Sequence, residues 1–160
     1  MRGVLPICFL LFISLVSCVK QPNEDPVPTL EYQEMINMRR VVSESLPARD
    51  TAVLVLNYSD GDGDLFRDNN SDGPNLIYST YAFDPDSLKF ILDQGPSPYT
   101  VTQPANGYYK GKAIHGEIFL PLKNFRSSTK IKVIRFETFI VDMKGNKSNV
   151  VVTPSFSLSF

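Results

Sequence analysis

The sequence predicts an all-β domain, an antiparallel sandwich of about seven strands that follows a cleaved signal peptide. Three observations predict it. Several short segments alternate apolar with polar residues, which is the period of a half-buried strand. Turn residues separate these segments, and none of them shows a helical period. Tyr and Phe number 7 and 11, Pro numbers 12 and Trp is absent, a composition that suits strands and turns.

The first 17 residues read as a secretory signal. Arg2 supplies a positive charge, and Val4 to Val16 form an apolar stretch without charge. This stretch is shorter than the roughly 20 residues that a membrane-spanning helix needs, and it fits the apolar core of a signal peptide. Its end, Leu-Val-Ser-Cys at residues 15–18, resembles the lipobox of bacterial lipoproteins.

The lipobox resemblance implies cleavage before Cys18 and a lipid on the cysteine sulfur and on the new amino group. Several acyl chains on one residue give stable anchoring, because each buried methylene contributes about 0.8 kcal/mol. The alternative is an ordinary secretory signal in which Cys18 is a chance residue. Residues 18–29, with three prolines, are expected to be a flexible tether, and residues 30–160 to be the sandwich domain.

Charge and cysteine content exclude several classes of function. The 16 basic and 17 acidic residues leave no clustered basic surface of the kind that nucleic acids require. Of the two cysteines, Cys8 leaves with the signal and Cys18 would be acylated. The mature chain therefore has no internal disulfide, no thiolate metal site and no cysteine nucleophile.

The first half of the domain holds four predicted strands and one segment expected to be irregular. Thr51–Tyr58 is apolar on both faces, which indicates a central strand or one covered on both sides. Residues 93–112 carry three prolines and three glycines and are expected to be irregular. The other predicted strands of this half are Leu30–Met38, Leu76–Phe83 and Leu88–Leu92.

The second half alternates more regularly. In Ala113–Leu122, Pro121 favours a strand end or an edge. In Lys130–Val141, Ile134, Phe136 and Ile140 are expected to face the core. Residues 142–149 form a predicted turn, and residues 150–160 a closing strand bent at Pro154. This set favours an immunoglobulin-like or fibronectin-type sandwich.

Three stretches together carry a resemblance: YSDGDGDL at 58–65, AIHGEIFLPL at 113–122 and FETFIVDMKGNKSNVVVTPSFSL at 136–158. The set resembles small lipoproteins of Bacteroidota-type bacteria, a group without an established activity. The last stretch is also similar to the Asp-x-x-Gly-Asn-x-Ser end of many bacterial immunoglobulin-like domains. The resemblance implies a β-sandwich on the outer membrane that faces the periplasm or the outside.

An acidic loop between two predicted strands is the candidate metal site. Alternating carboxylates among glycines suit Ca²⁺, which takes six to eight oxygen ligands. The alternative is a pair of plain turns, because Asp, Asn and Gly are the usual turn residues. Against plain turns, five aspartates within thirteen residues repel one another. The candidate ligands are Asp60, Asp62, Asp64, Asp68, Asn70 and Asp72.

Neither register of this loop matches a complete EF-hand. Asp68, Asn70, Asp72 and Gly73 reproduce the start of such a loop, but the twelfth position is Ser79 where Glu is expected. Counted from Asp60, the sixth position is a leucine, not glycine. The sequence predicts a looser calcium loop or none.

The expected function is a non-enzymatic, lipid-anchored envelope domain with a binding or structural role, its partner an envelope protein or a glycan. His115, the one histidine, lies in a predicted strand and is expected at the surface. Tyrosines that could line a binding surface are Tyr78, Tyr81, Tyr99, Tyr108 and Tyr109. Two alternatives remain: a calcium-stabilised adhesin-like module, and a small envelope hydrolase, which would need a pocket with convergent carboxylates.

Overall fold

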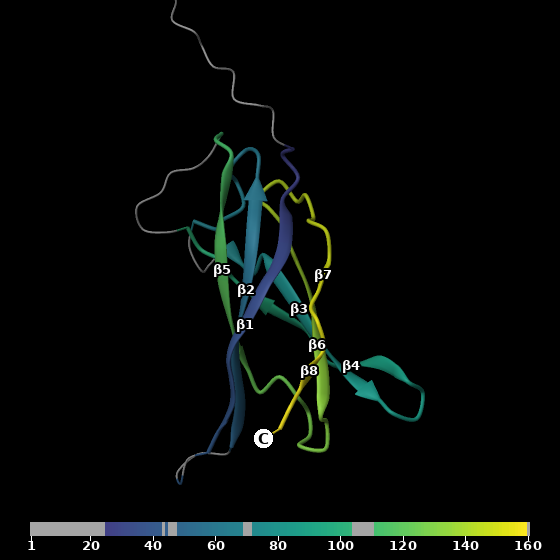
Figure 1. Ribbon diagram of the computed structural model, residues 1–160. Coiled ribbons are helices and arrows are strands. Elements are labelled where there is room, and N and C mark those ends of the chain that lie inside the picture. Colours follow the sequence, from purple (N-terminus) through teal and green to yellow (C-terminus); the bar gives the residue numbers. More distant parts are fainter. Residues whose placement is uncertain (1–24, 43, 45–47, 69–71, 104–110, 160) are drawn as a thin grey trace, which may run out of the picture.

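The protein is an all-β sandwich of two antiparallel sheets (Figure 1). The computed structural model describes residues 25–159 except 43, 45–47, 69–71 and 104–110. Eight strands are found in this part of the chain: β1 Thr29–Val41, β2 Arg49–Asp60, β3 Leu76–Asp84, β4 Lys89–Tyr99, β5 Ile114–Lys123, β6 Val133–Ile140, β7 Val151–Val152 and β8 Phe156–Ser157. The predicted fold class is confirmed.

The smaller sheet has the strand order β1-β2-β5, and the larger has β4-β3-β6-β7, with β8 also paired to β6. The chain therefore changes sheet after β2, after β4 and again after β5. These crossovers follow the Greek-key pattern of immunoglobulin-like sandwiches. The fourth strand remains beside β3 in the larger sheet, as strand C′ does in variable-type domains.

The core lies between the inner faces of the two sheets. Alternation along β2 points Leu54 and Leu56 inward, and alternation along β6 does the same for Ile134, Phe136 and Ile140, all of them fully buried. The expectation that these three β6 residues face the core is confirmed. β2 lies between β1 and β5, so its prediction as a central strand is also confirmed.

The prediction of irregular structure over residues 93–112 was wrong for its first part, because β4 continues to Tyr99 and pairs with β3 along its length. Two prolines, Pro96 and Pro98, lie within it. β4 is the edge of its sheet, and an edge strand tolerates a residue that lacks an N–H group. Pro121 lies in β5, an edge strand of the smaller sheet, as predicted.

Most of the predicted tether, like Cys18, lies outside the described residues. Its described part, residues 25–29, contacts the sandwich: the Gly61 amide donates to the Asp25 carbonyl oxygen at 3.1 Å. β1 begins at Thr29, beside Ser59 near the end of β2. In the part of the chain that the structure describes, no helix is long and apolar enough to span a membrane.

A buried ion pair joins the start of β2 to the connection between β5 and β6. Arg126 donates from Nε to Asp50 Oδ2 at 2.6 Å and from a terminal nitrogen to Asp50 Oδ1 at 3.0 Å. Both side chains are almost fully buried, and Arg126 also donates to the Ile131 carbonyl oxygen. Arg40 adds a third contact to Asp50 from β1. The two-point geometry satisfies the carboxylate without water.

We predict that Arg126→Met destabilises the fold by about 3 kcal/mol or more, because it leaves the Asp50 carboxylate buried without its main partner. Urea unfolding monitored by circular dichroism measures the change. Arg39→Met is the matched control, since Arg39 is exposed and the same replacement there changes stability by less than about 0.5 kcal/mol. Equal effects of the two replacements would contradict the prediction.

Candidate metal centre

The acidic loop begins inside the core. We call the end of the sandwich where β1 and β5 begin and β2 ends the acidic pole; it is the upper end in Figure 1. Asp60, the last residue of β2, continues the inward-facing series of Leu54 and Leu56, and the residue is only 1% exposed. A carboxylate therefore closes the apolar core at this end.

Three carboxylates converge at the acidic pole. Asp60, Asp62 and Asp64 each offer one oxygen, and the three oxygens lie within 4.8 Å of one another. In each of the three residues the Oδ1 atom is buried without a hydrogen-bond partner among the described residues. Buried polar atoms are nearly always paired, so three unpaired acceptors in one place indicate a missing positive partner. The arrangement could hold a metal ion.

The backbone holds this loop in shape. Asp64 donates its amide to Asp60 Oδ2 at 2.9 Å, which curls the chain around the first carboxylate. Gly63 at the bend has a φ of 70°, a conformation that glycine adopts without a steric penalty. The carbonyl oxygens of Asp62 and Asp64 accept from Gly111 and Met143, so the segments after β4 and β6 both brace the loop.

The turn after β6 brings further charges to the site. Lys144 Nζ contacts Asp62 Oδ2 and lies 3.2 Å from Asp64 Oδ2, yet its side chain is 59% exposed. Asp142 is buried and accepts from the Asn146 amide at 2.8 Å and from its side chain at 2.7 Å. The sequence reasoning missed both residues, because they lie about 80 positions along the chain from the loop.

Burial and mutual repulsion alter the acidity of these groups. Burial, then the charges of Asp62 and Asp64, raise the pKa of Asp60 from 3.8 to about 6. Burial, with a contribution from Asp142, also raises the pKa of Asp64 above its ordinary value. Burial opposes ionisation of Asp62 as well, but the Lys144 ammonium outweighs it and holds the pKa of Asp62 below its usual range.

Asn75, which the sequence reasoning also missed, links the segments of the acidic pole by hydrogen bonds. Its side-chain amide donates to the Leu65 carbonyl oxygen at 2.8 Å, and its side-chain oxygen accepts from the Val101 amide at 2.7 Å. Its backbone carbonyl accepts from Val141. One buried residue therefore joins the acidic loop to the segments that follow β4 and β6. A lone Asn between a turn and a strand gives no sequence signal for this role.

The other predicted ligands are not part of the cluster. Asp68 and Asp72 are exposed and lie outside the group of three carboxylates, and Asn70 is outside the described residues. The EF-hand-like register from Asp68 leads to Ser79, which pairs with Glu137 within the larger sheet. The structure thus brings together the first three of the six predicted ligands.

The remaining sequence candidates lie elsewhere. His115 is exposed on edge strand β5. Tyr78 and Tyr99 pack against the core. The Arg135 guanidinium lies over the ring of Tyr81, 5.5 Å from the ring centre. Tyr108 and Tyr109 fall outside the described residues. The described tyrosines therefore do not gather into one exposed surface.

We predict that Asp60 makes the metal-free fold less stable as pH rises from about 4 to about 7. Its pKa is about 6 in the fold and near 3.8 when unfolded, so the folded chain holds the proton more tightly between these values. Asp60→Asn cannot ionise. In EDTA it should match the wild type near pH 4 and exceed it by about 2 kcal/mol at pH 7. Urea unfolding across this pH range measures the difference, and a difference independent of pH would contradict the prediction.

Comparisons of this chain with protein-family models, with curated proteins and with solved structures found no match.

Proposed function

We propose that the protein is a lipid-anchored, non-enzymatic domain of the cell envelope whose acidic pole binds Ca²⁺. The domain then has a binding or structural role toward another envelope component. The observation that carries the proposal is the set of three buried, unpaired carboxylate oxygens on Asp60, Asp62 and Asp64. The ion stabilises the end of the sandwich from which the chain runs back toward Cys18.

The donor set favours calcium over other metals. All three side chains offer hard carboxylate oxygens, and no histidine or cysteine belongs to the group. Such ligands suit Ca²⁺, Mg²⁺ and Mn²⁺, whereas zinc and copper favour imidazole and thiolate. Among these hard cations, Ca²⁺ tolerates irregular geometry and takes six to eight oxygens, so backbone carbonyls and water would complete its shell. Mg²⁺ demands a stricter octahedron.

A metal at this position would act on stability through three segments. The loop after β2 supplies the carboxylates, and the segments after β4 and β6 hydrogen-bond to its backbone. An ion that satisfies the three carboxylates removes their repulsion and fixes these segments relative to one another. Binding to the folded chain alone raises the free energy of unfolding by mass action.

We predict that about 1 mM Ca²⁺ raises the melting temperature of residues 19–160 relative to EDTA. For a dissociation constant near 10 μM, linkage adds about 2.7 kcal/mol, equivalent to about 5–10 °C for a domain of this size. Mg²⁺ should give a smaller rise. Differential scanning calorimetry measures both. No shift with either ion would leave the aspartates as turn residues.

Two charge-matched replacements in the same loop locate the site. Asp60→Asn removes a buried ligand and should abolish the Ca²⁺-dependent rise. Asp68→Asn makes the same chemical change at an exposed position outside the cluster and should keep the rise. If both variants retain it, the ion binds elsewhere.

The anchor is tested separately, through the full-length chain expressed in a Gram-negative host. We predict that an alkyne-tagged fatty acid labels the wild type and that Cys18→Ser remains unlabelled, because acylation requires the sulfur and the amino group of residue 18. Detergent phase partition should move the variant from the detergent phase to the aqueous phase. A labelled Cys18→Ser chain would disprove the anchor and leave the metal site untouched.

A further inference from the structure

The four sheet edges are protected to different degrees against pairing with another strand. β1 carries two register shifts, and Asn37 within it has a φ of 55°. β5 contains Pro121, and β7 and β8 have two residues each with Pro154 between them. Bulges, prolines and short strands are the usual means by which edges avoid other chains. β4 has Pro96 and Pro98 in its second half, and its two register shifts against β3 also lie there, between Leu92 and Ser97.

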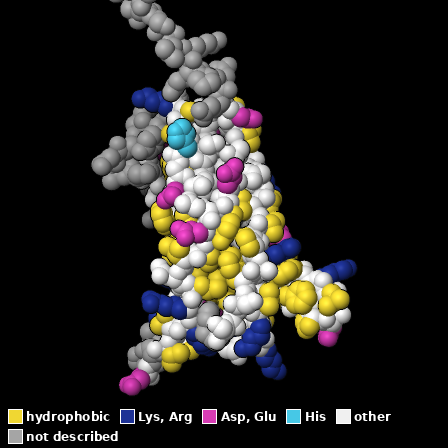
Figure 2. Space-filling model, in the orientation of Figure 1, with side chains coloured by type: hydrophobic (Ala, Val, Ile, Leu, Met, Phe, Trp, Pro, Cys, Tyr) yellow, Lys and Arg dark blue, Asp and Glu magenta, His cyan; other side chains and the backbone are white. Residues whose placement is uncertain are grey.

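The first part of β4, Lys89–Leu92, keeps an unbroken register with β3 and is consequently an open edge, and Asp93 follows it at the first register shift. No described strand pairs with its outer side. Ile91 and Leu92 are each 52% exposed although they point to opposite faces, so neither face of this hairpin is fully covered. Figure 2 shows hydrophobic side chains on the lobe that projects at the lower right, where the β3–β4 hairpin lies in Figure 1.

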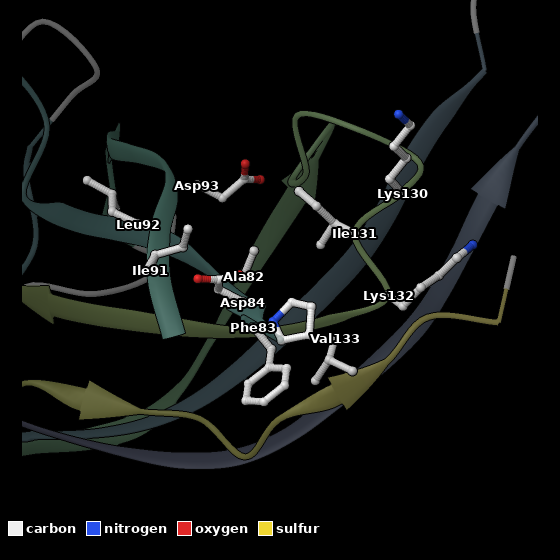
Figure 3. Close-up of a pocket in the computed structure, with 11 residues that line it drawn as sticks. Ala82, Phe83, Asp84, Ile91, Leu92, Asp93, Lys130, Ile131, Lys132 and Val133 are labelled. Atoms are coloured by element: carbon white, nitrogen blue, oxygen red, sulfur yellow. The ribbon is translucent and has the colours of Figure 1, made fainter. Parts of the chain in front are cut away.

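The inner face of the hairpin borders a cleft of about 430 Å³. Ile91 lies on one side of it, and Ile131, just before β6, and Val133, the first residue of β6, lie on the other (Figure 3). The smaller sheet does not extend over this part of the larger one. The open edge therefore continues into an exposed apolar surface.

Local contacts hold the turn and the strands of the hairpin together. Asp84 accepts hydrogen bonds at the turn from the amides of Asp86 and Ser87, and the Ser87 hydroxyl donates to it at 2.6 Å. The rings of Phe83 and Phe90 meet edge to face at 5.5 Å. Because these contacts fix the strand in advance, a partner would pair with it at little further cost in conformational entropy.

We propose that this edge pairs with the same edge of a second copy of the chain, so that two larger sheets join into one across a two-fold axis at Ile91. In an antiparallel pair, directly opposite residues point to the same face of the sheet. Two copies of one strand therefore pair so that one residue lies opposite the same residue of the second copy, and the two-fold axis passes between these two residues. Within residues 89–93, only axes at residues 90, 91 and 92 pair three or more residues of each strand. Only the axis at Ile91 sets Lys89 opposite Asp93 of the second copy.

The sequence of this edge is self-complementary in that register. Lys89 and Asp93 form one ion pair on each side of the axis, and Ile91 meets Ile91 between them. On the outer face Phe90 lies opposite Leu92, again twice. Such aromatic–aliphatic and opposite-charge cross-strand pairs stabilise antiparallel sheets. Asp93 accepts from the Ser127 amide and hydroxyl, which hold its carboxylate in place while each oxygen keeps a free lone pair.

Sedimentation velocity on residues 19–160, from about 1 to about 100 μM, tests the proposal, since small interfaces dissociate in this range. We expect a monomer–dimer equilibrium, equally in EDTA and in Ca²⁺. Lys89→Asp and Asp93→Lys should each weaken the dimer by about tenfold or more, because each turns two attractions into two repulsions. An equimolar mixture of the two variants restores both attractions and should form a heterodimer as strong as the wild-type dimer.

A second pair of variants covers the case in which Asp93→Lys does not fold. Ile91→Arg places two arginines at the axis and should give a monomer. Phe119→Arg makes a similar change on the edge strand of the other sheet, where Phe119 is 55% exposed, and should leave the dimer intact. A wild-type chain that is monomeric at the highest concentration, a mixture that stays monomeric when both variants fold, or a dimer lost in Phe119→Arg instead would overturn the proposal.

Discussion

The fold depends on the burial of the inner faces of β2 and β6 against each other. β2 is the middle strand of the smaller sheet and β6 is an interior strand of the larger one, and both carry fully buried side chains, among them Leu54, Leu56 and Phe136. Neither sheet alone removes these groups from water, so the two layers form together or not at all. The flanking strands then extend each sheet by backbone hydrogen bonding. The charged clusters lie outside this apolar layer, at strand ends and edges such as the acidic pole and the free edge of β4.

Both ends of the sandwich bury charged groups, but in opposite ways. At the start of β2, Asp50 meets a guanidinium that matches it at two points, and the pair is complete within the chain. At the end of β2, Asp60 meets two further carboxylates, and its pKa rises to about 6. Burial strengthens attraction and repulsion alike, because the surrounding dielectric is low. One end of β2 is thus fixed by its own partners, and the other carries three carboxylates whose Oδ1 atoms have no hydrogen-bond partner among the described residues.

Period-two patterns carried most of the fold information. The alternation of Ile134, Phe136 and Ile140 located β6, and Pro154 located the break in the closing strand, because both signals are local. The second half of β4 was missed because Pro96 and Pro98 argue against a strand unless it is known to be an edge, which depends on the sheet order. At the site, the spacing of Asp60, Asp62 and Asp64 identified candidate ligands. Local sequence could not supply Asn75, Lys144 or the pairing of Asp50 with Arg126, since these contacts join distant segments.

The charge balance at the acidic pole shows that Lys144 alone does not neutralise the three carboxylates. Three ionised carboxylates and one ammonium leave two negative charges. The nearby Asp142 adds to this excess, although its oxygens are occupied by Asn146. Lys144 reaches Asp62 and Asp64 from a side chain that is mostly in solvent, and it leaves the innermost carboxylate, Asp60, unneutralised. A divalent cation among the three unpaired oxygens would neutralise the net charge of the three aspartates and Lys144 and satisfy all three acceptors at once. A proton on Asp60 relieves only part of the repulsion and does so only at acidic pH, so near neutral pH the geometry favours the ion.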